Sequence, residues 1–179
     1  AGHGPRVLHA ANSAATILHP ASHLDLVRVG LAMYGLQPGP GVGAELGLRP
    51  ALAWRSTVTM AKRLPAGEPL SYGHRYRTAV PSTIATVPVG YADGYPRHLS
   101  SRADALVGGA RARVAGNITM DQLLLDCKDR SVEAGDDVVL LGRQGDESVT
   151  AEELADRGGT IPYEIVSRVG PRVPREYHG

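Results

Sequence analysis

Two short segments near the start of the chain carry groups that can hold an anion. Ser13 follows Asn12 at a predicted helix N-terminus, where free backbone N–H groups and the helix dipole favour negative charge. Farther along, Arg28 and Gly30 end a predicted strand, and a glycine lets a ligand approach the backbone closely. In a (β/α) barrel both segments would lie at the rim that binds phosphate groups. A capped helix that binds no ligand is the alternative, and these residues alone do not exclude it.

Four further segments place tyrosine, arginine or methionine side chains beside turns. They are Ser71-Tyr72-Gly73, Gly90-Tyr91-Ala92-Asp93-Gly94-Tyr95-Pro96-Arg97, Thr119-Met120-Asp121-Gln122 and Ile161-Pro162-Tyr163-Glu164. A phenol that projects from a loop can transfer a proton when it lies beside a substrate. Each segment alone also fits a simpler interpretation, a surface tyrosine in a turn or a methionine in the core. Only the segments taken together indicate a function.

The first quarter of the chain alternates between strand and helix patterns. Residues 7–10 and 25–31 are apolar strand candidates, and residues 13–18 are a helix candidate that Pro20 stops. Strand, helix and strand at this spacing predict a βαβ unit of a parallel sheet or barrel. Residues 37–47 are rich in glycine and proline but contain no complete GxGxxG phosphate loop, so they predict an interdomain linker.

After the linker, alternating apolar residues predict strands and two segments predict short helices. The strand candidates are residues 52–60, 83–91, 105–107, 110–115, 122–126, 137–141 and 173–177. Gly108-Gly109 is a hairpin signal. Thr150 and Glu153 form a capping box for a helix that ends at Arg157, and Pro162 suits the first turn of a second helix over residues 163–169. The predicted fold class is mainly β, a β-barrel-like domain with two short helices, preceded by a remnant of an α/β domain.

The composition argues against several classes of protein. Of 179 residues, 42% are apolar, and 19 basic residues nearly balance 18 acidic ones. These values indicate neither wholesale disorder nor a nucleic-acid surface. One cysteine, Cys127, excludes an internal disulfide framework and favours a reducing, cytoplasmic compartment. No apolar run reaches the length of a membrane span, so we expect none. The histidines lack the spacing and the carboxylate neighbours of a metal site, so we expect no bound metal.

Taken together, the anion-binding and tyrosine segments resemble the alanine racemase family and occur in the family's order. The matching segments are His9-x-x-Asn12-Ser13-Ala14-Ala15, Arg28-Val29-Gly30-Leu31-Ala32-Met33-Tyr34-Gly35, Ser71-Tyr72-Gly73, Gly90 to Arg97, Gly116 with Met120-Asp121, and Tyr163-Glu164 followed by Arg172-Val173-Pro174-Arg175. The resemblance implies an enzyme that uses pyridoxal 5′-phosphate (PLP) to interconvert L- and D-alanine by two-base proton transfer at Cα. It also implies that residues 1–36 are the remnant of a PLP-binding TIM-type (β/α)8 barrel and residues 48–179 a C-terminal β domain.

The resemblance implies which residues bind the cofactor. The PLP phosphate would be held by the Ser13 hydroxyl, the N–H groups of Gly30 and Leu31, and the Tyr163 hydroxyl. Arg28 would face the pyridine nitrogen, with His9 and Asn12 behind it. A guanidinium keeps its proton near neutral pH, so the ring nitrogen would stay unprotonated and the cofactor would be a weaker electron sink. This arrangement favours return of the proton to Cα over transamination.

The resemblance also implies which groups act on the substrate. Tyr72 would be the catalytic residue on one face of Cα, opposite the lysine that forms the Schiff base with PLP. The Met120 N–H would meet the substrate carboxylate, and Tyr91, Arg97 and Asp121 would surround the entrance. In the family, the tyrosine and the methionine come from the opposite subunit of a head-to-tail homodimer.

Two features depart from the family pattern. Neither Lys62 nor Lys128 lies in the context of the family's Schiff-base lysine, and the first residue is Ala1 rather than Met. We therefore expect part of a longer protein, a part that alone is inactive and binds PLP weakly if at all. Asn117 follows Gly116 where family members often carry arginine, which leaves the charge of the substrate corridor open. Two alternatives also stay open: a related PLP racemase for serine or several amino acids, and a non-catalytic β domain for dimerisation or binding.

Overall fold

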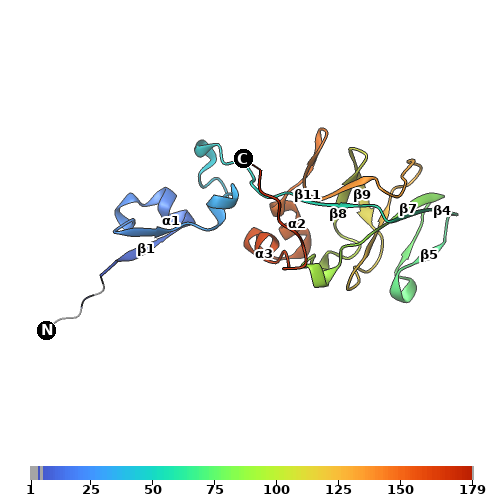
Figure 1. Ribbon diagram of the computed structural model, residues 1–179, viewed down its shortest axis with the longest axis horizontal. Helices are drawn as coiled ribbons and strands as arrows, with labels where there is room; N and C mark the ends of the chain where they lie inside the picture. The colour runs from blue at the N-terminus through green and yellow to red at the C-terminus, as the bar shows by residue number, and fades with distance from the viewer. Residues whose placement is uncertain (1–3, 5, 179) are drawn as a thin grey trace. The chain divides into compact units, whose positions relative to one another are not determined.

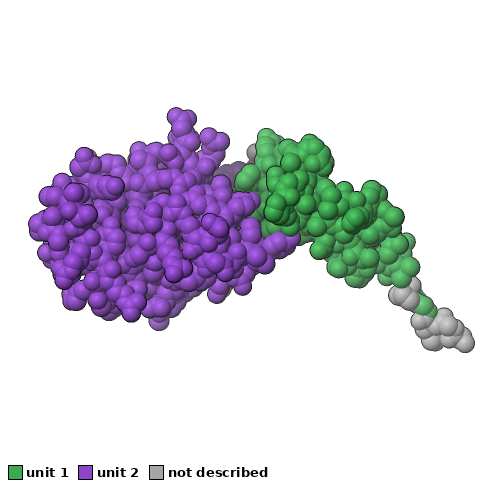
Figure 2. Space-filling model, turned by 180° about the vertical axis from the view of Figure 1, so that it is seen from behind, with its two compact units in different colours: residues 1–52 green, residues 53–179 purple. Residues whose placement is uncertain are grey.

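The computed structural model describes residues 4 and 6–178, and the chain divides into two compact units (Figures 1 and 2). Unit 1 is Ala1–Leu52 and unit 2 is Ala53–Gly179. Residues 37–47, expected to be a linker, belong to unit 1 and carry the 3-10 helix η3 (Ala44–Leu46). Their role as an interdomain linker stays a prediction.

Unit 1 contains the predicted βαβ arrangement. In chain order its first elements are β1 (His9–Asn12), α1 (Ser13–Leu18), η1 (Pro20–Ser22), β2 (Leu26–Arg28) and η2 (Leu31–Tyr34). β1 pairs in parallel with β2. α1 begins where the Asn12 side chain accepts a hydrogen bond from the Ala15 N–H at 3.0 Å. It ends two residues before Pro20, because proline has no N–H to donate to the next helical hydrogen bond.

Unit 2 is built on an eight-stranded antiparallel sheet (Figure 1). Its strands are β3 (Trp54–Thr57), β4 (Met60–Leu64), β7 (Ser82–Val87), β8 (Asp104–Val107), β9 (Ala110–Val114), β10 (Leu123–Asp126), β11 (Asp137–Gln144) and β12 (Glu147–Val149). The order across the sheet is β12-β11-β8-β9-β10-β7-β4, and β3 also pairs with β11. The mainly β fold class is confirmed.

One expected strand, residues 52–60, is two strands in the structure. β3 pairs with β11 and β4 pairs with β7, and only Val58 and Thr59 separate them. The Val58 N–H donates to the loop before β11, whereas the Thr59 N–H donates to β7, each at 2.9 Å. The alternating pattern therefore continues through a bend, and this bend ties β11 to β7 and curls the sheet into a half-barrel.

Apolar side chains of the strands, together with residues of α2 and of the loops, form the core of unit 2. The largest fully buried side chains are Tyr95, Leu99, Leu106, Ile118, Leu123, Leu125, Leu140 and Leu154. All four residues of β8 are buried. The predicted hairpin between β8 and β9 is present, and Gly108 and Gly109 both have left-handed φ values, +59° and +75°, as a tight two-residue turn requires.

Two short helices, α2 (Ala151–Gly158) and α3 (Pro162–Ser167), pack together in unit 2 (Figure 1). Both were expected. The Thr150 hydroxyl accepts a hydrogen bond from the Glu153 N–H at 3.1 Å, and Gly159 ends the helix with φ +67°. The Glu153 carboxylate bonds to Arg111 instead, so only half of the capping box is formed. Among the described residues, no helix is long and apolar enough to cross a membrane.

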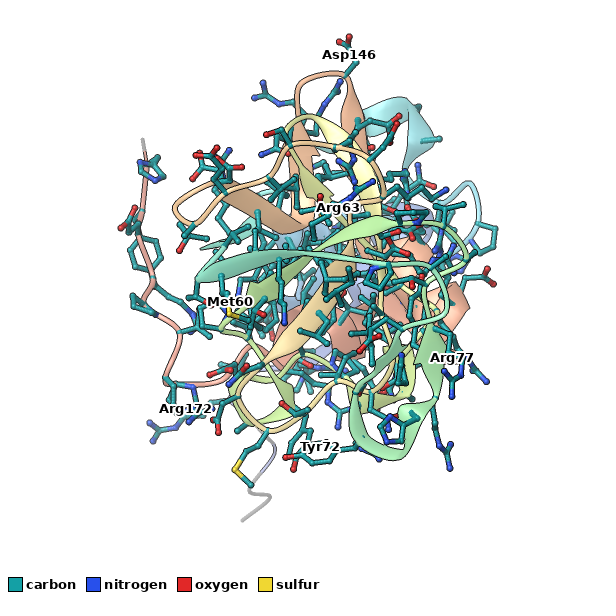
Figure 3. All side chains as sticks on the ribbon, turned by 90° about the vertical axis from the view of Figure 1, so that its right-hand side faces the viewer. Met60, Arg63, Tyr72, Arg77, Asp146 and Arg172 are labelled. Atoms are coloured by element: carbon teal, nitrogen blue, oxygen red, sulfur yellow. The ribbon has the colours of Figure 1, made fainter. Side chains whose placement is uncertain are left out.

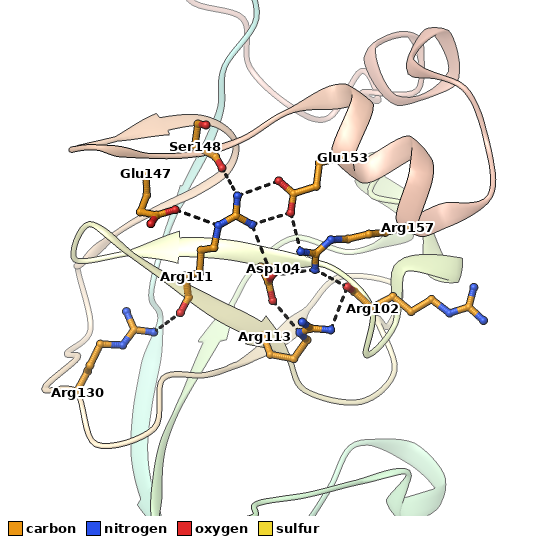
Figure 4. A network of polar contacts seen from close by, with 9 residues as sticks. All are labelled: Arg102, Asp104, Arg111, Arg113, Arg130, Glu147, Ser148, Glu153 and Arg157. Carbon is orange, nitrogen blue, oxygen red and sulfur yellow. Dashed lines mark hydrogen bonds and ion pairs between the residues drawn. The ribbon is translucent and has the colours of Figure 1, made fainter. Parts of the chain in front are cut away.

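A network of charged side chains joins α2 to the sheet (Figure 4). Its members are Asp104, Arg111, Arg113, Glu147, Glu153 and Arg157. Asp104 is buried and lies 2.8 Å from Arg157 and 2.7 Å from Arg113. Glu153 lies 2.6 Å from Arg111 and 2.8 Å from Arg157. Asp104 and Glu153 therefore each have at least two guanidinium partners, which compensates the loss of hydration on partial burial.

The strand expected over residues 173–177 is wrong, because this segment is irregular in the structure. Pro174 has no N–H for a ladder. The Arg175 guanidinium donates instead to backbone carbonyls of residues 169, 170 and 173, at 2.6 to 2.8 Å.

Loops of unit 2 carry the remaining elements. They are β5 (Pro69–Leu70), η4 (Tyr72–His74), β6 (Tyr76–Arg77), η5 (Tyr91–Asp93) and η6 (Arg97–Leu99). β5 and β6 pair as a short antiparallel ribbon. Three of the expected site residues lie in the 3-10 helices of these loops.

Candidate functional site

Tyr72 lies at the tip of the ribbon formed by β5 and β6. The residue is 76% exposed, and its side chain projects from the ribbon in Figure 3. Around it, Ser71, Gly73 and His74 have left-handed φ values of +64°, +72° and +51°. Such a conformation costs a residue other than glycine on the order of 1–3 kcal/mol, so it persists only where the surroundings hold it. Tyr72 is therefore exposed, but the backbone of its loop is held in a defined conformation.

Tyr72 borders a cavity of about 460 Å³, called here the Tyr72 cavity. Its lining includes Tyr72, Tyr91, Arg97, Asn117, Met120 and Asp121. Five of these six are expected site residues, and they come from three loops that are far apart in the sequence. The fold of unit 2 therefore brings together the expected substrate and entrance residues.

Backbone packing fixes two of these loops against each other. The N–H groups of Tyr91 and Ala92 donate to the carbonyls of Thr119 and Met120, each at 3.0 Å. A Cβ at Gly90 would lie 2.2 Å from the Met120 carbonyl oxygen, so only glycine permits this approach. The Met120 N–H itself donates no hydrogen bond to any described residue and stays available to a ligand.

The charges around the Tyr72 cavity are unevenly paired. Arg172 donates to Asp121 at 2.9 Å and lies 3.0 Å from Asp93, whose carboxylate also accepts from the Gly90 N–H. Arg97 has no carboxylate partner among the residues that the structure describes. The cavity therefore offers one unpaired cation and one free N–H, which suits a carboxylate.

Ser71 and Asn117 contact the Tyr72 loop but were not among the expected site residues. The Asn117 N–H donates to the Ser71 hydroxyl at 2.9 Å, and the Asn117 side-chain amide donates to the Tyr72 carbonyl at 2.9 Å. These residues lie 46 and 45 positions apart, so no sequence period reveals the contacts. The sequence pointed to Asn117 only as a departure from the family pattern and to Ser71 only as a neighbour of Tyr72.

In unit 1, the predicted anion-binding groups lie together. The buried Ser13 hydroxyl accepts hydrogen bonds from the N–H groups of Gly30 at 3.0 Å and Ala32 at 3.4 Å, which leaves its own hydrogen to donate. The Leu31 N–H has no hydrogen-bond partner among the described residues. A Cβ at Gly30 would meet nothing within 4 Å, so the space beside these donors is open. The set fits a phosphate group, although the Gly30 N–H expected to bind it points to Ser13.

Arg28 and His9 form the expected pair. Arg28 Nη1 lies 2.6 Å from His9 Nδ1. A guanidinium has no acceptor, so His9 Nδ1 accepts this hydrogen bond and the ring proton lies on Nε2. Asn12, expected beside them, caps α1.

Tyr163 is the expected site residue of unit 2 that does not line the Tyr72 cavity. It is in the first turn of α3 and is exposed. Among the described residues, no group of three His, Cys, Asp or Glu side chains could hold a metal ion.

Comparisons with known proteins match both units. Residues 51–177 match the family model for the alanine racemase C-terminal domain, and residues 1–38 match the model for the N-terminal domain. The chain is 53% identical over 180 residues to the alanine racemase of Symbiobacterium thermophilum, covering 100% of this chain and 48% of that protein. The corresponding values for the alanine racemase of Frankia casuarinae are 52%, 99% and 47%.

Solved structures give the same result. The crystal structure of alanine racemase from D-cycloserine-producing Streptomyces lavendulae has a TM-score of 0.91 and 49% identity, covering 99% of this chain and 47% of that one. The Bacillus anthracis enzyme with bound L-Ala-P has a TM-score of 0.87 and 40% identity, covering 96% and 45%. The chain spans about half the length of the curated relatives it matches. With a family model over most of its residues, the chain belongs to the alanine racemase family.

Proposed function

We propose that this chain forms the C-terminal part of an alanine racemase in which the Tyr72 phenol transfers a proton at Cα of alanine. The observation that carries the proposal is the Tyr72 cavity, where the exposed Tyr72 phenol meets four other expected site residues, so that three separate loops contribute. A base on one face of Cα and an acid on the other are the simplest means of inverting that centre. Tyr72 supplies one of these groups.

The other cavity residues bind and orient the substrate. The Met120 N–H donates to the carboxylate of alanine, and Arg97 supplies a positive charge at the entrance. Tyr91 and Asp121 form the walls, with Asp121 held by Arg172. Holding the carboxylate in one place fixes which face of Cα the Tyr72 phenol meets.

The family uses PLP, and the residues of unit 1 fit its phosphate. When bound, PLP supplies the electron sink that makes the Cα proton acidic. The Ser13 hydroxyl and the Leu31 N–H would donate to the phosphate, together with the Gly30 N–H where it is released from Ser13. The phosphate role of the Tyr163 hydroxyl stays a prediction from the family resemblance. Arg28, oriented by His9, donates a hydrogen bond toward the ring nitrogen and keeps its own proton.

In the complete enzyme, Tyr72 and Met120 act in the site of the opposite subunit of a head-to-tail homodimer. The exposure of Tyr72 supports this arrangement, since the phenol is free to enter a partner's site.

We place the enzyme in the cytoplasm. In support, Cys127 is the only cysteine of the sequence, and a chain without an internal disulfide is typical of a reducing compartment.

The test is racemisation of alanine by the complete enzyme and by its Tyr72→Phe variant, with Tyr177→Phe as a matched control at an exposed tyrosine that borders no part of the Tyr72 cavity. We expect the wild-type protein to interconvert L- and D-alanine, and Tyr72→Phe to lower kcat by about 10²–10⁴-fold while PLP stays bound. Tyr177→Phe should retain full activity. Unchanged turnover in Tyr72→Phe would contradict the role of Tyr72, and preferential racemisation of serine would correct the substrate.

A further inference from the structure

Three hydrogen bonds fasten the Tyr72 loop to the segment that follows β9. The Asn117 N–H donates to the Ser71 hydroxyl at 2.9 Å, and this hydroxyl donates back to the Asn117 carbonyl at 3.2 Å. The Asn117 side-chain amide donates to the Tyr72 carbonyl at 2.9 Å. Ser71 and Asn117, with these three bonds, are called the Ser71–Asn117 clamp.

The backbone on one side of the clamp is itself fixed. Gly116 has φ +82°, and a Cβ there would lie 2.5 Å from the Ser71 Cβ, so the close approach requires glycine. The Gly116 N–H donates to the Ser101 hydroxyl at 3.1 Å, and the Ile118 N–H donates to the Ser100 hydroxyl at 2.9 Å. Asn117 is therefore held from both sides.

The far end of the Tyr72 loop is anchored separately. The half-buried Tyr76 hydroxyl donates to the Asp126 carboxylate at 2.7 Å. Burial, followed by the hydrogen bond to Asp126, raises the pKa of Tyr76 far above its usual range, so this hydroxyl keeps its proton and the bond persists through neutral pH. Between the two anchors, Ser71 and His74 keep left-handed φ values that are unfavourable for their residue types.

The clamp acts on the residue that carries the phenol. The side-chain amide of Asn117 donates to the carbonyl of Tyr72 itself. The other two hydrogen bonds of the clamp fix Ser71, the residue just before Tyr72. We infer that the Ser71–Asn117 clamp holds the Tyr72 phenol in the orientation from which it exchanges a proton with Cα of the substrate, which makes Ser71 and Asn117 positioning residues. This inference rests on the function proposed for Tyr72.

Proton transfer is sensitive to such positioning. The donor and acceptor must lie within about 2.6–3.2 Å of each other, and a displacement of about 1 Å can slow a reaction by roughly 10²-fold. Removing the clamp leaves the phenol chemically unchanged but lets the strained loop relax. The expected defect is therefore in the rate of proton transfer, with substrate and cofactor binding retained.

Two variants test the clamp in the complete enzyme. Asn117→Ala removes the bond to the Tyr72 carbonyl. Ser71→Gly removes the hydroxyl with its two hydrogen bonds and leaves a residue that accepts φ +64° without strain, which offsets part of the loss of stability. We expect each variant to lower kcat by about 10–100-fold with little change in KM for alanine or in PLP content. Asn117→Gln, which keeps an amide donor, should recover part of the loss.

The control is Gln144→Ala. The Gln144 side chain makes the same kind of contact elsewhere, since its amide donates to the Asp137 carbonyl at 3.1 Å and its carbonyl accepts from the Gly109 N–H at 2.9 Å. If the clamp only stabilised the fold, loss of the Asn117 amide or of the Gln144 amide would change the free energy of unfolding and leave kcat unchanged. Gln144→Ala should leave kcat unchanged.

A second measurement separates positioning from general damage. We expect Tyr72 to take the proton of L-alanine, as the family resemblance implies. In D2O, exchange of the Cα hydrogen of L-alanine then depends on Tyr72, whereas exchange in D-alanine begins at the base on the opposite face. We expect the two clamp variants to slow exchange in L-alanine more than in D-alanine, and to speed amide hydrogen exchange at Tyr72 and Gly73. Equal slowing of exchange in both enantiomers, or wild-type kinetics in both clamp variants, would overturn the inference. Tyr72→Phe would still report on the proposed function. Absence of racemisation by the wild-type enzyme would overturn both.

Discussion

At the residue scale, the Tyr95 hydroxyl differs from the other buried polar groups. Tyr95 is 1% exposed, and its ring meets Trp54 edge-on with centroids 5.7 Å apart. Its hydroxyl is the one buried side-chain oxygen or nitrogen that lacks a hydrogen-bond partner among the described residues. Burial raises the pKa of this phenol well above its usual range, so the group stays neutral and unpaired.

We therefore expect Tyr95→Phe to keep or raise the free energy of unfolding, by up to about 1 kcal/mol, because it removes a desolvated group that forms no bond. Urea unfolding of wild type and variant measures the difference. A loss of more than about 1 kcal/mol would show that the hydroxyl makes a hydrogen bond, for example to an enclosed water.

Some residues of the site could be predicted from the sequence, and others could not. Tyr72, Met120 and Arg97 lie in segments with a recognisable order of residue types, and the structure places them on one cavity. Ser71 and Asn117 meet through hydrogen bonds across 46 residues, and neither residue type nor spacing specifies such a partner. Local chemistry was predictable, but the contacts that fix its geometry were not.

At the scale of elements, turns were the most predictable features and strand ends the least. Gly108-Gly109 and Thr150 act through backbone conformation and capping, which are local, and both occur as expected. The bend at Val58 depends on two strands distant in sequence, β7 and β11, and alternation of apolar residues does not encode such long-range pairing. At residues 173–177 the alternation suggested a strand, but Pro174 lacks the N–H that a strand ladder needs.

The approach of the Tyr91 and Met120 loops makes a testable prediction. Gly90→Ala would place a Cβ 2.2 Å from the Met120 carbonyl oxygen, so the two loops must separate. We expect a loss of about 1–3 kcal/mol in the free energy of unfolding and altered NMR shifts for the amides of residues 119–122. Wild-type stability and shifts would mean that the loops do not pack as described.

At the scale of the whole molecule, the charged network around Asp104 makes stability depend on pH. The hydrogen bond from Arg111 lowers the pKa of Glu153, opposed by a smaller effect of burial. A carboxyl whose pKa is lower in the folded state stabilises the fold above its ordinary value, near pH 4.3, and the stabilisation is lost as the pH falls through the lower folded value. Glu153 therefore stabilises unit 2 at neutral pH.

We expect Glu153→Gln to lower the free energy of unfolding by about 1–2 kcal/mol at pH 7, with the difference from wild type shrinking in acid below about pH 4. Glu152→Gln, at an exposed neighbouring position in α2, is the matched control and should be neutral. Denaturant titrations at several pH values measure both variants. A pH-independent difference would show that Glu153 acts by packing instead of charge.

The two lysines of the chain lead to a prediction for the 179 residues alone. Lys62 lies on β4 and Lys128 in the turn after β10, and neither borders the Tyr72 cavity. We expect the isolated chain to show no racemase activity and to form no borohydride-stable adduct between PLP and either lysine. Peptide mass spectrometry after reduction detects such an adduct, and a stoichiometric one would contradict the proposed division of the site between this chain and a lysine outside it.

The most direct test of the account is exchange of the Cα hydrogen with D2O, catalysed by the Tyr72→Phe variant of the complete enzyme and followed separately for each enantiomer of alanine. If the Tyr72 phenol is the proton-transfer group on one face, the variant loses exchange in L-alanine and keeps exchange in D-alanine. Equal exchange in both enantiomers at the wild-type rate would contradict the account.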